Sequence, residues 1–431
     1  MEKYIVFDRD LTPADVVVLK SLCNDIEACS SRVGSEKDGS TLLGDKALNQ
    51  SSTTCLADDK LKPTVLLSTD DYSERVPGGI NKLVIEPFIR WAQQAARHDS
   101  DVVMIIHLIL YFSTSVPSAF LLYRNFNYAH GVGHLVMQIY YIGTYTLMMH
   151  QHIHQRGILS KKYGWLDQLF PYILDPLMGH TWNTYYYHHV KHHHVEGNGP
   201  DDLSSTMRYQ RDSVGDFLRY VGRFFVLVWI DLPLYFVRKH RPGLAMRTAG
   251  WEIATYLFYY GMATRADARA TLFVYILPFV VLRLGLMVGN WGQHAFVDMD
   301  DPTSDFRSSI TLIDVASNRF CFNDGYHTSH HLNPLRHWRD HPNAFLEQKH
   351  TYAREGALVF HNIDFLMITY RLLRKDYGHL AKCLVPLGHQ RELTLEGRAE
   401  LLQRLTRKMD EKSILDQFGK GKGLGDRRKT G

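Results

Sequence analysis

The sequence lacks a strong charge of one sign, a cysteine framework and an apolar leader. Its formal net charge is only +4 over 431 residues, which indicates no surface for nucleic acid. The five cysteines show no CxxC spacing, so no disulfide framework is indicated, and a reducing compartment on at least one side fits. Acidic residues within the first ten positions, MEKYIVFDRD, argue against a secretory signal or a mitochondrial transit peptide.

Long apolar segments are present, although the mean hydropathy of −0.22 conceals them among polar ends. Val102–Tyr123 and Gly131–Met149 are each close to the roughly 20 residues that cross a hydrocarbon layer. A short polar turn joins them, so we expect a helical hairpin that returns to the side from which it starts. Gly250–Met262 and Leu272–Val288 predict a second hairpin.

A further apolar stretch, Phe217–Val237, contains the charged residues Arg219, Arg223 and Asp231. Charges at mid-helix are costly in lipid, so we interpret this stretch as a helix at the membrane interface. The alternative makes it a crossing and leaves one arm of the second hairpin partial.

These patterns predict an all-α integral membrane protein with about four transmembrane helices in two hairpins and a cytosolic helical cap that carries the site. We expect a polar, partly disordered region over residues 1–100, with a small helix at Val16–Leu19 and a serine-rich linker from Ser30 to Thr54. A membrane domain is expected over 101–375, and a helical part with a basic tail over 376–431.

Histidines are grouped with short spacings that suit metal binding. Neutral imidazole is the commonest protein metal ligand, and spacings of three or four residues place two rings on one helix face. Three such groups exceed what one four-coordinate zinc needs, so the pattern predicts two metal ions. The groups are His150-x-x-x-His154, His189-x-x-His192-His193 and His327-x-x-His330-His331, and His294 stands alone between the last two.

Some positions around these groups stay open. The second group also permits HxxxHH registers that begin at His188 or His189, and His188 and His194 are the weaker candidates. Asn290 precedes His294 by one helical turn and can bind a metal through water by its amide oxygen. Three nearby carboxylates can orient imidazole N–H groups, although a turn or cap role is the commoner one for such residues; they are Asp201, Asp202 and Asp324.

A competing pair, His130 and His134, also has HxxxH spacing. About 20 helical residues, or about 30 Å, separate it from His150 and His154, which places the two pairs at opposite faces of the bilayer. No stretch between His154 and His189 can cross the membrane, so the first and second groups share a side. We therefore interpret His130 and His134 as structural.

The chain resembles the integral-membrane fatty acid desaturase superfamily over about residues 100–375. The three histidine boxes carry the resemblance, together with two elements similar to the stearoyl-CoA desaturase branch: Asn290-x-x-x-His294 and Gly325-Tyr326-His327-Thr328-Ser329-His330-His331. The first box departs from that branch, because its HxxxH spacing is the one often found in acyl-lipid desaturases and hydroxylases.

The resemblance implies a cytosolic di-iron centre (Fe2+/Fe3+) held by the nine histidines and Asn290, with O2 as co-substrate and a lipid acyl chain as substrate. It further implies electrons from an external cytochrome b5 or ferredoxin system and a location in the endoplasmic reticulum membrane. A hydroxylase or monooxygenase on the same scaffold is the nearest alternative. More distant alternatives are a zinc-dependent membrane hydrolase and a lipid-binding or metal-handling protein without catalysis.

Overall fold

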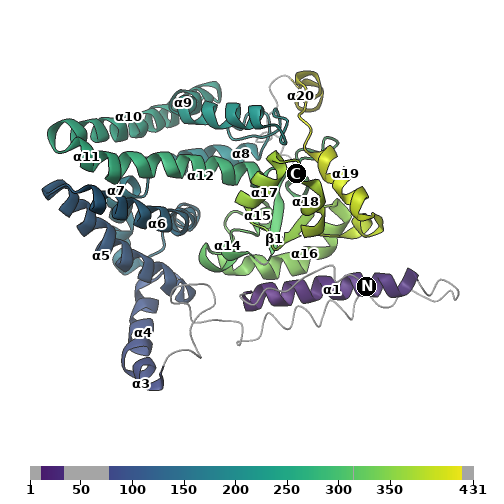
Figure 1. The fold of residues 1–431 in the computed structure, drawn as a ribbon, viewed down its shortest axis with the longest axis horizontal. Helices are drawn as coiled ribbons and strands as arrows, with labels where there is room; N and C mark the ends of the chain where they lie inside the picture. Colours follow the sequence, from purple (N-terminus) through teal and green to yellow (C-terminus); the bar gives the residue numbers. More distant parts are fainter. Residues whose placement is uncertain (1–10, 34–76, 314, 420–431) are drawn as a thin grey trace. The chain divides into compact units, whose positions relative to one another are not determined.

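The computed structural model describes residues 11–33, 77–313 and 315–419. These residues are mostly helical with almost no sheet, which confirms the all-α expectation (Figure 1). Most of the expected serine-rich linker and the basic tail from Lys420 onward lie outside the described residues.

Two compact units share the chain, and neither is continuous in sequence. The membrane unit comprises the described parts of 64–205, 218–290 and 414–431, and the sheet unit those of 1–63, 206–217 and 291–413. We had divided the sequence into consecutive regions, whereas the units interleave: the chain passes from one to the other between the second and third histidine boxes.

The membrane unit begins with the expected helical hairpin. Helix α5 (Val102–Arg124) is followed by α6 (Tyr128–Gln155) after a short turn. Asn127 caps α6, because its side-chain oxygen accepts hydrogen bonds from the backbone N–H groups of Ala129 and His130 at 2.8 and 3.3 Å. α6 continues beyond the expected apolar stretch, and the first histidine box therefore lies in its last two turns.

The second half of this unit differs from the preferred interpretation of the sequence. Within the described residues, three segments are long and apolar enough to cross a membrane: Asp99–Arg124, Val214–Arg238 and Ala268–Gln293. The second contains helix α9 (Val214–Arg238), which we had placed at the interface. Its charges offset one another, since Arg223 Nε lies 3.1 Å from Asp231 Oδ2.

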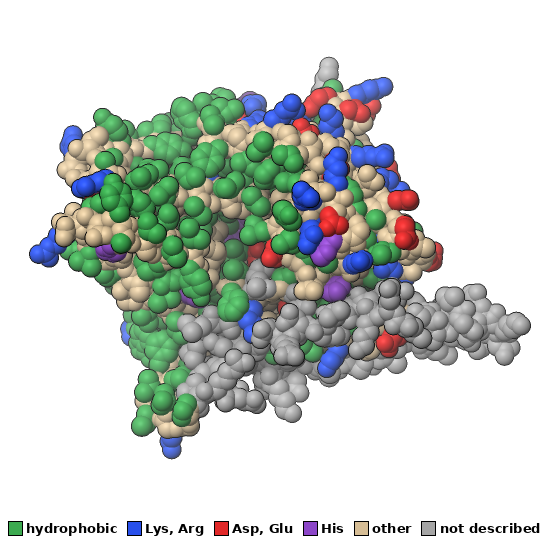
Figure 2. Space-filling view, viewed as in Figure 1, with side chains coloured by type: hydrophobic (Ala, Val, Ile, Leu, Met, Phe, Trp, Pro, Cys, Tyr) green, Lys and Arg blue, Asp and Glu red, His purple; other side chains and the backbone are tan. Residues whose placement is uncertain are grey.

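Two helices that contain expected crossings are not among these three segments: α6, with Gly131–Met149, and α10 (Pro242–Arg265), with Gly250–Met262. The buried Glu252 of α10 forms an ion pair at 2.9 Å with Arg283 of α12 (Leu277–Gln293), and Thr181 donates a hydrogen bond to the same carboxylate. A pair with both charges satisfied costs far less in an apolar environment than either charge alone. Figure 2 shows hydrophobic side chains gathered over α10 and α12.

The sheet unit contains a three-stranded sheet that the sequence did not predict. Strand β1 (Ile310–Ile313) pairs in parallel with β2 (Leu358–His361), which pairs antiparallel with β3 (Leu384–Val385). Helix α1 (Pro13–Val33) is longer than the expected Val16–Leu19 and packs Val18, Leu19 and Leu22 into the same core.

Shorter elements complete the two units. The membrane unit also contains α4 (Glu86–Ala95), α7 (Gly164–Leu177) and the π-helix η5 (Tyr186–His193). The sheet unit contains α15 (His327–Leu332), α16 (His341–Glu355), α17 (Phe365–Leu373), α18 (Tyr377–Cys383), η8 (Gly388–Glu392) and α19 (Leu395–Leu405), followed by α20 (Glu411–Phe418).

Candidate metal centre

In the membrane unit, four histidine rings form one group. His150 and His154 lie four residues apart on α6 with ring centroids 4.8 Å apart. His189 Nε2 lies 3.3 Å from His150 Nε2 and 3.1 Å from His194 Nε2. One ligand atom of each of the four residues lies within 4.8 Å of those of the others.

The π-helix explains why His194 joins this group. A π-helix bonds residue i to residue i+5, so positions five apart come onto one face, where an α-helix would align positions three and four apart. His189 and His194 are five apart and their ring centroids are 4.5 Å apart. The geometry therefore favours the His189-x-x-x-His193-His194 register, one of those that the sequence left open.

His192 is engaged elsewhere. Its ring is fully buried, and Nε2 accepts a hydrogen bond from the backbone N–H of Leu203 at 3.1 Å. The ring also lies edge-on to Tyr235, with centroids 4.4 Å apart. Its predicted role as a ligand stays a prediction, and the structure places His194 in the ring group where we expected His192.

The neighbouring His193 is oriented by a buried carboxylate. His193 Nδ1–H donates to Asp202 Oδ2 at 2.7 Å, and Asp202 also accepts from the backbone N–H groups of Asn198 and Ser204. Burial alone would raise the pKa of Asp202, but His193 and His192 hold it well below its usual range. An ionised Asp202 fixes the Nδ1–H tautomer and leaves His193 Nε2 as the ligand atom.

Two other polar residues near the boxes behave differently. The Asp201 carboxylate pairs with Lys239 at 2.9 Å, and within the described part of the chain Asp201 contacts an imidazole only through its backbone carbonyl, which lies 3.2 Å from His192 Nε2. Asn290 donates both amide N–H groups, to Ser204 O at 2.8 Å and to Tyr220 Oη at 2.7 Å. Its Oδ1 is thereby directed as an acceptor, which suits the expected contact with metal-bound water.

The sheet unit carries a second group of three rings. His294 follows α12, and His327 and His331 lie four residues apart on α15. His327 Nε2 lies 3.3 Å from His294 Nε2 and 3.1 Å from His331 Nε2. His330 faces away from this group within its own unit, with its ring centroid 6.2 Å from those of His327 and His331.

The protonation of these rings suits a metal ion. His294 Nδ1 lies 2.7 Å from the carbonyl oxygen of Ser308, which can only accept, so the proton is on Nδ1 and Nε2 carries a lone pair. In the membrane unit, burial and the neighbouring rings lower the pKa of His189 well below its ordinary value, which keeps it neutral. Clustered neutral nitrogens are the donor set that iron, copper or zinc takes.

A buried arginine that the sequence analysis missed fixes the segment of His294. The Arg211 side chain is 0% exposed, and among the residues that the structure describes its guanidinium donates only to backbone carbonyls. These belong to Ala295 (3.1 Å), Thr206 (2.9 Å), Tyr209 (3.4 Å), Leu405 (2.9 Å) and Arg407 (2.6 Å). Thr206 Oγ1 in addition donates to His294 O at 2.7 Å. Three distant segments are thus tied together around one predicted ligand.

Hydrogen bonds to Asp15 of α1 hold the third histidine box, as those of Arg211 hold the segment of His294. Tyr326, directly before His327, donates its hydroxyl to the buried Asp15 at 2.7 Å. Asn318 donates to both oxygens of Asp15 and accepts from the N–H of Gly325 at 2.9 Å. A Cβ at Gly325 would come within 3.0 Å of Asn318 and of the Leu312 carbonyl. The N-terminal helix therefore helps to hold the third box, a role that no sequence motif announced.

The competing pair has a structural explanation. His130 and His134 each lie 2.9 Å from Ser118 Oγ, and Gln138 lies 3.1 Å from His134 Nε2. These hydrogen bonds join α5 to α6 at the far end of α6 from His150 and His154, in keeping with the structural role that we expected.

The histidine boxes lie within a stretch that matches a known family model. Residues 126–362 match the model for fatty acid desaturases. The chain belongs to the fatty acid desaturase family. No match was found among curated proteins or among solved structures. Membership makes this desaturase-family chain a membrane-associated oxidoreductase acting on lipid, and it accounts for both histidine groups at once.

Proposed function

We propose that the chain is a fatty acyl desaturase that introduces a double bond into a lipid acyl chain at a histidine-ligated di-iron centre. The observation that carries the proposal is the presence, in a desaturase-family chain, of two groups of imidazole rings whose Nε2 atoms converge. The proposed ligands are His150, His154, His189, His193, His194, His294, His327, His330 and His331, with Asn290 acting through water.

Iron at these nitrogens would supply the oxidant, made from O2 and two electrons, that removes hydrogen from an unactivated methylene pair. The overall reaction balances as one –CH2–CH2– unit, O2, two electrons and two protons giving –CH=CH– and two waters. We propose that a separate cytochrome b5 or ferredoxin system supplies the electrons.

The residues around the site hold protons and exclude water. Asp202 and the Ser308 carbonyl keep the Nδ1 protons of His193 and His294 in place, so that each Nε2 can ligate. The rings of His193, His294, His327 and His331 are buried, which limits the access of bulk water to an oxidant that would otherwise be wasted. Apolar helices give an acyl chain a route that stays within lipid, and we propose the endoplasmic reticulum as the membrane, with the boxes facing the cytosol.

The decisive experiment is expression of the chain in a host that lacks polyunsaturated lipids, followed by lipid analysis. We expect a new double bond that requires O2 and is lost with His327→Ala, and about two irons in the purified protein. A hydroxylated chain in place of an alkene would assign the site to a hydroxylase. Zinc without iron, with turnover under anaerobic conditions, would refute oxygen chemistry altogether.

A further inference from the structure

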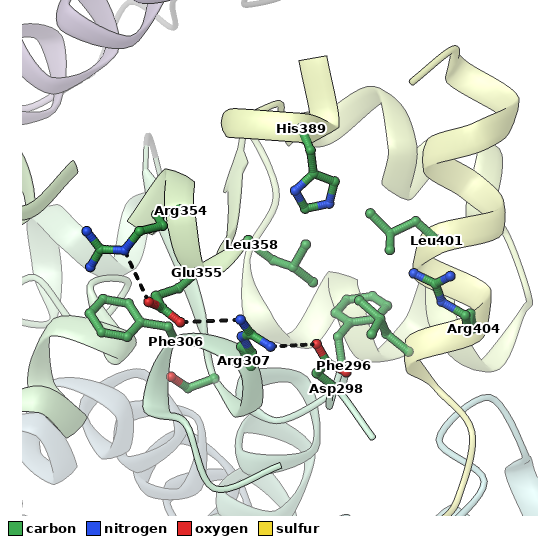
Figure 3. A pocket seen from close by; sticks show the side chains of 13 residues that line it. Phe296, Asp298, Phe306, Arg307, Arg354, Glu355, Leu358, His389, Leu401 and Arg404 are labelled. Atoms are coloured by element: carbon green, nitrogen blue, oxygen red, sulfur yellow. Dashed lines mark hydrogen bonds and ion pairs between the residues drawn. The ribbon is translucent and has the colours of Figure 1, made fainter. Parts of the chain in front are cut away.

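The sheet unit contains a pocket that none of the proposed metal ligands lines. Its volume is about 280 Å³, and its walls come from the segments around β1, β2, α16, η8 and α19 (Figure 3). Phe296, Phe306, Leu358, Leu401 and Leu405 give it an apolar lining. Three arginines and one histidine, against two acidic residues, complete the lining.

The acidic residues of the pocket are already neutralised. Arg307 lies 3.5 Å from Asp298 and 3.4 Å from Glu355, so both carboxylates share one guanidinium, and Arg354 adds a second contact to Glu355 at 3.5 Å. This wall of the pocket therefore carries no negative charge that lacks a cationic partner.

The opposite walls carry basic side chains that the protein leaves unpaired. Arg404 of α19 and His389 of η8 have no side-chain hydrogen bond or ion pair with any described residue. Figure 3 shows them on two further sides of the space around Arg307 and Leu358. Three nitrogen-bearing side chains from separate elements therefore surround one apolar lining.

From this arrangement we propose that the pocket binds an organic carboxylate with a short apolar chain, such as a medium-chain fatty acid. The carboxylate of the ligand lies among Arg404, His389 and Arg307, and its alkyl chain packs against the leucines and phenylalanines of the lining. Charged hydrogen bonds supply orientation and the apolar lining supplies affinity. At about 280 Å³ the pocket has room for a small ligand of this kind.

The pocket is separate from the proposed iron ligands, but two of its lining residues are close in sequence to the His294 segment. Phe296 follows His294 by two residues, and Ser309 is adjacent to Ser308, whose carbonyl accepts from His294. A bound carboxylate is therefore placed to affect the His294 segment. The proposal does not depend on desaturation, because it rests on the pocket alone.

Octanoate binding to the full-length protein in detergent provides the test, measured by calorimetry alongside octanol and inorganic phosphate. We expect octanoate to bind, with affinity roughly tenfold weaker in Arg404→Ala and in His389→Ala. Lys412→Ala, an exposed change beyond the pocket, should bind as the wild type does. Arg404→Glu should lose octanoate and gain octylamine, which separates charge recognition from misfolding.

Two outcomes would overturn the proposal. Equal binding of octanol and octanoate would show partition into apolar surface without recognition of the charge. Binding of phosphate as tight as that of octanoate would show a simple anion site. Neither outcome bears on desaturation, which the lipid analysis tests separately.

Discussion

The two histidine groups rest on different kinds of support. In the membrane unit, the rings stand on α6, on a π-helix and at His194, which follows the π-helix directly and donates its backbone N–H to His189 O, so the helical repeat sets their spacing. In the sheet unit, the rings lie on a six-residue helix and just beyond the end of α12, and hydrogen bonds from remote residues hold them. A regular helix can thus place ligands by its own geometry, whereas a short segment needs hydrogen bonds from residues elsewhere in the chain.

The largest effect should come from removing the central ring of either group. We expect His189→Ala and His327→Ala each to lose about half of the bound iron and all product, because each ring stands at the centre of its own group. Iron content and lipid profiles are the measurements, with the exposed His350→Ala as the control. If either variant kept both irons, the ring groups would not be the iron sites.

The π-helix makes a sharper prediction for the membrane unit. His194→Asn should lose iron as His189→Ala does, because His194 lies in the four-ring group. His192→Asn should keep its iron and lower only the melting temperature, since His192 is bonded to the 201–203 segment. If His192→Asn lost iron and His194→Asn kept it, the ligands would follow the HxxHH register, and the π-helix would not determine which ring binds the metal.

The hydrogen bonds of the Arg211 guanidinium, which we call the clamp of the sheet unit, predict that a change at Arg211 lowers both the stability of the protein and its iron content. Arg211→Met leaves five carbonyls without their donor and should cost at least about 3 kcal/mol of unfolding free energy. Iron should fall to the level of His294→Ala, and Arg211→Lys should recover part of it.

Lys408→Ala, an exposed change close in sequence to the clamped carbonyls, serves as its control. Thermal unfolding and iron content are measured on the same samples. Full iron in a destabilised Arg211→Met protein would mean that the clamp supports the fold without positioning His294.

The smallest of the four effects should follow loss of an orienting carboxylate. In Asp202→Asn, an amide N–H group replaces one of the carboxylate oxygens that accept from His193 Nδ1 and from the backbone N–H groups of Asn198 and Ser204. Because His193 then loses its orienting partner, metal affinity should fall by roughly 10- to 100-fold. Asp201→Asn, one residue earlier but paired with Lys239, should leave it unchanged. Competition with a coloured chelator measures both, and equal losses would argue against an orienting role for Asp202.

Sequence patterns anticipated what depends on local periodicity. The helical hairpin, the spacing of His150 and His154, and that of His327 and His331 follow from repeats within one segment. For Phe217–Val237 we preferred an interfacial helix because of its charges, whereas the structure makes Val214–Arg238 a candidate crossing, which was the alternative left open. Arg223 and Asp231 lie 3.1 Å apart within this helix, and a count of charges does not register such pairing.

The features of the site and the fold that we did not predict depend mostly on residues that are distant in sequence. His194 ranked low because helical spacing was assumed to be that of an α-helix. Arg211 and Asp15 belong to no motif, and their partners lie up to 196 and 311 residues away. Strands of two to four residues leave too little alternation to be recognised.

The guanidinium of Arg211 makes the segment of His294 depend on residues outside the stretch shared with the family. Two of its five acceptors, the carbonyls of Leu405 and Arg407, lie beyond residues 126–362. A truncation just before Leu405 would remove both acceptors and leave the guanidinium with three. The boundary of the family match is therefore not the boundary of the structure that supports this predicted ligand.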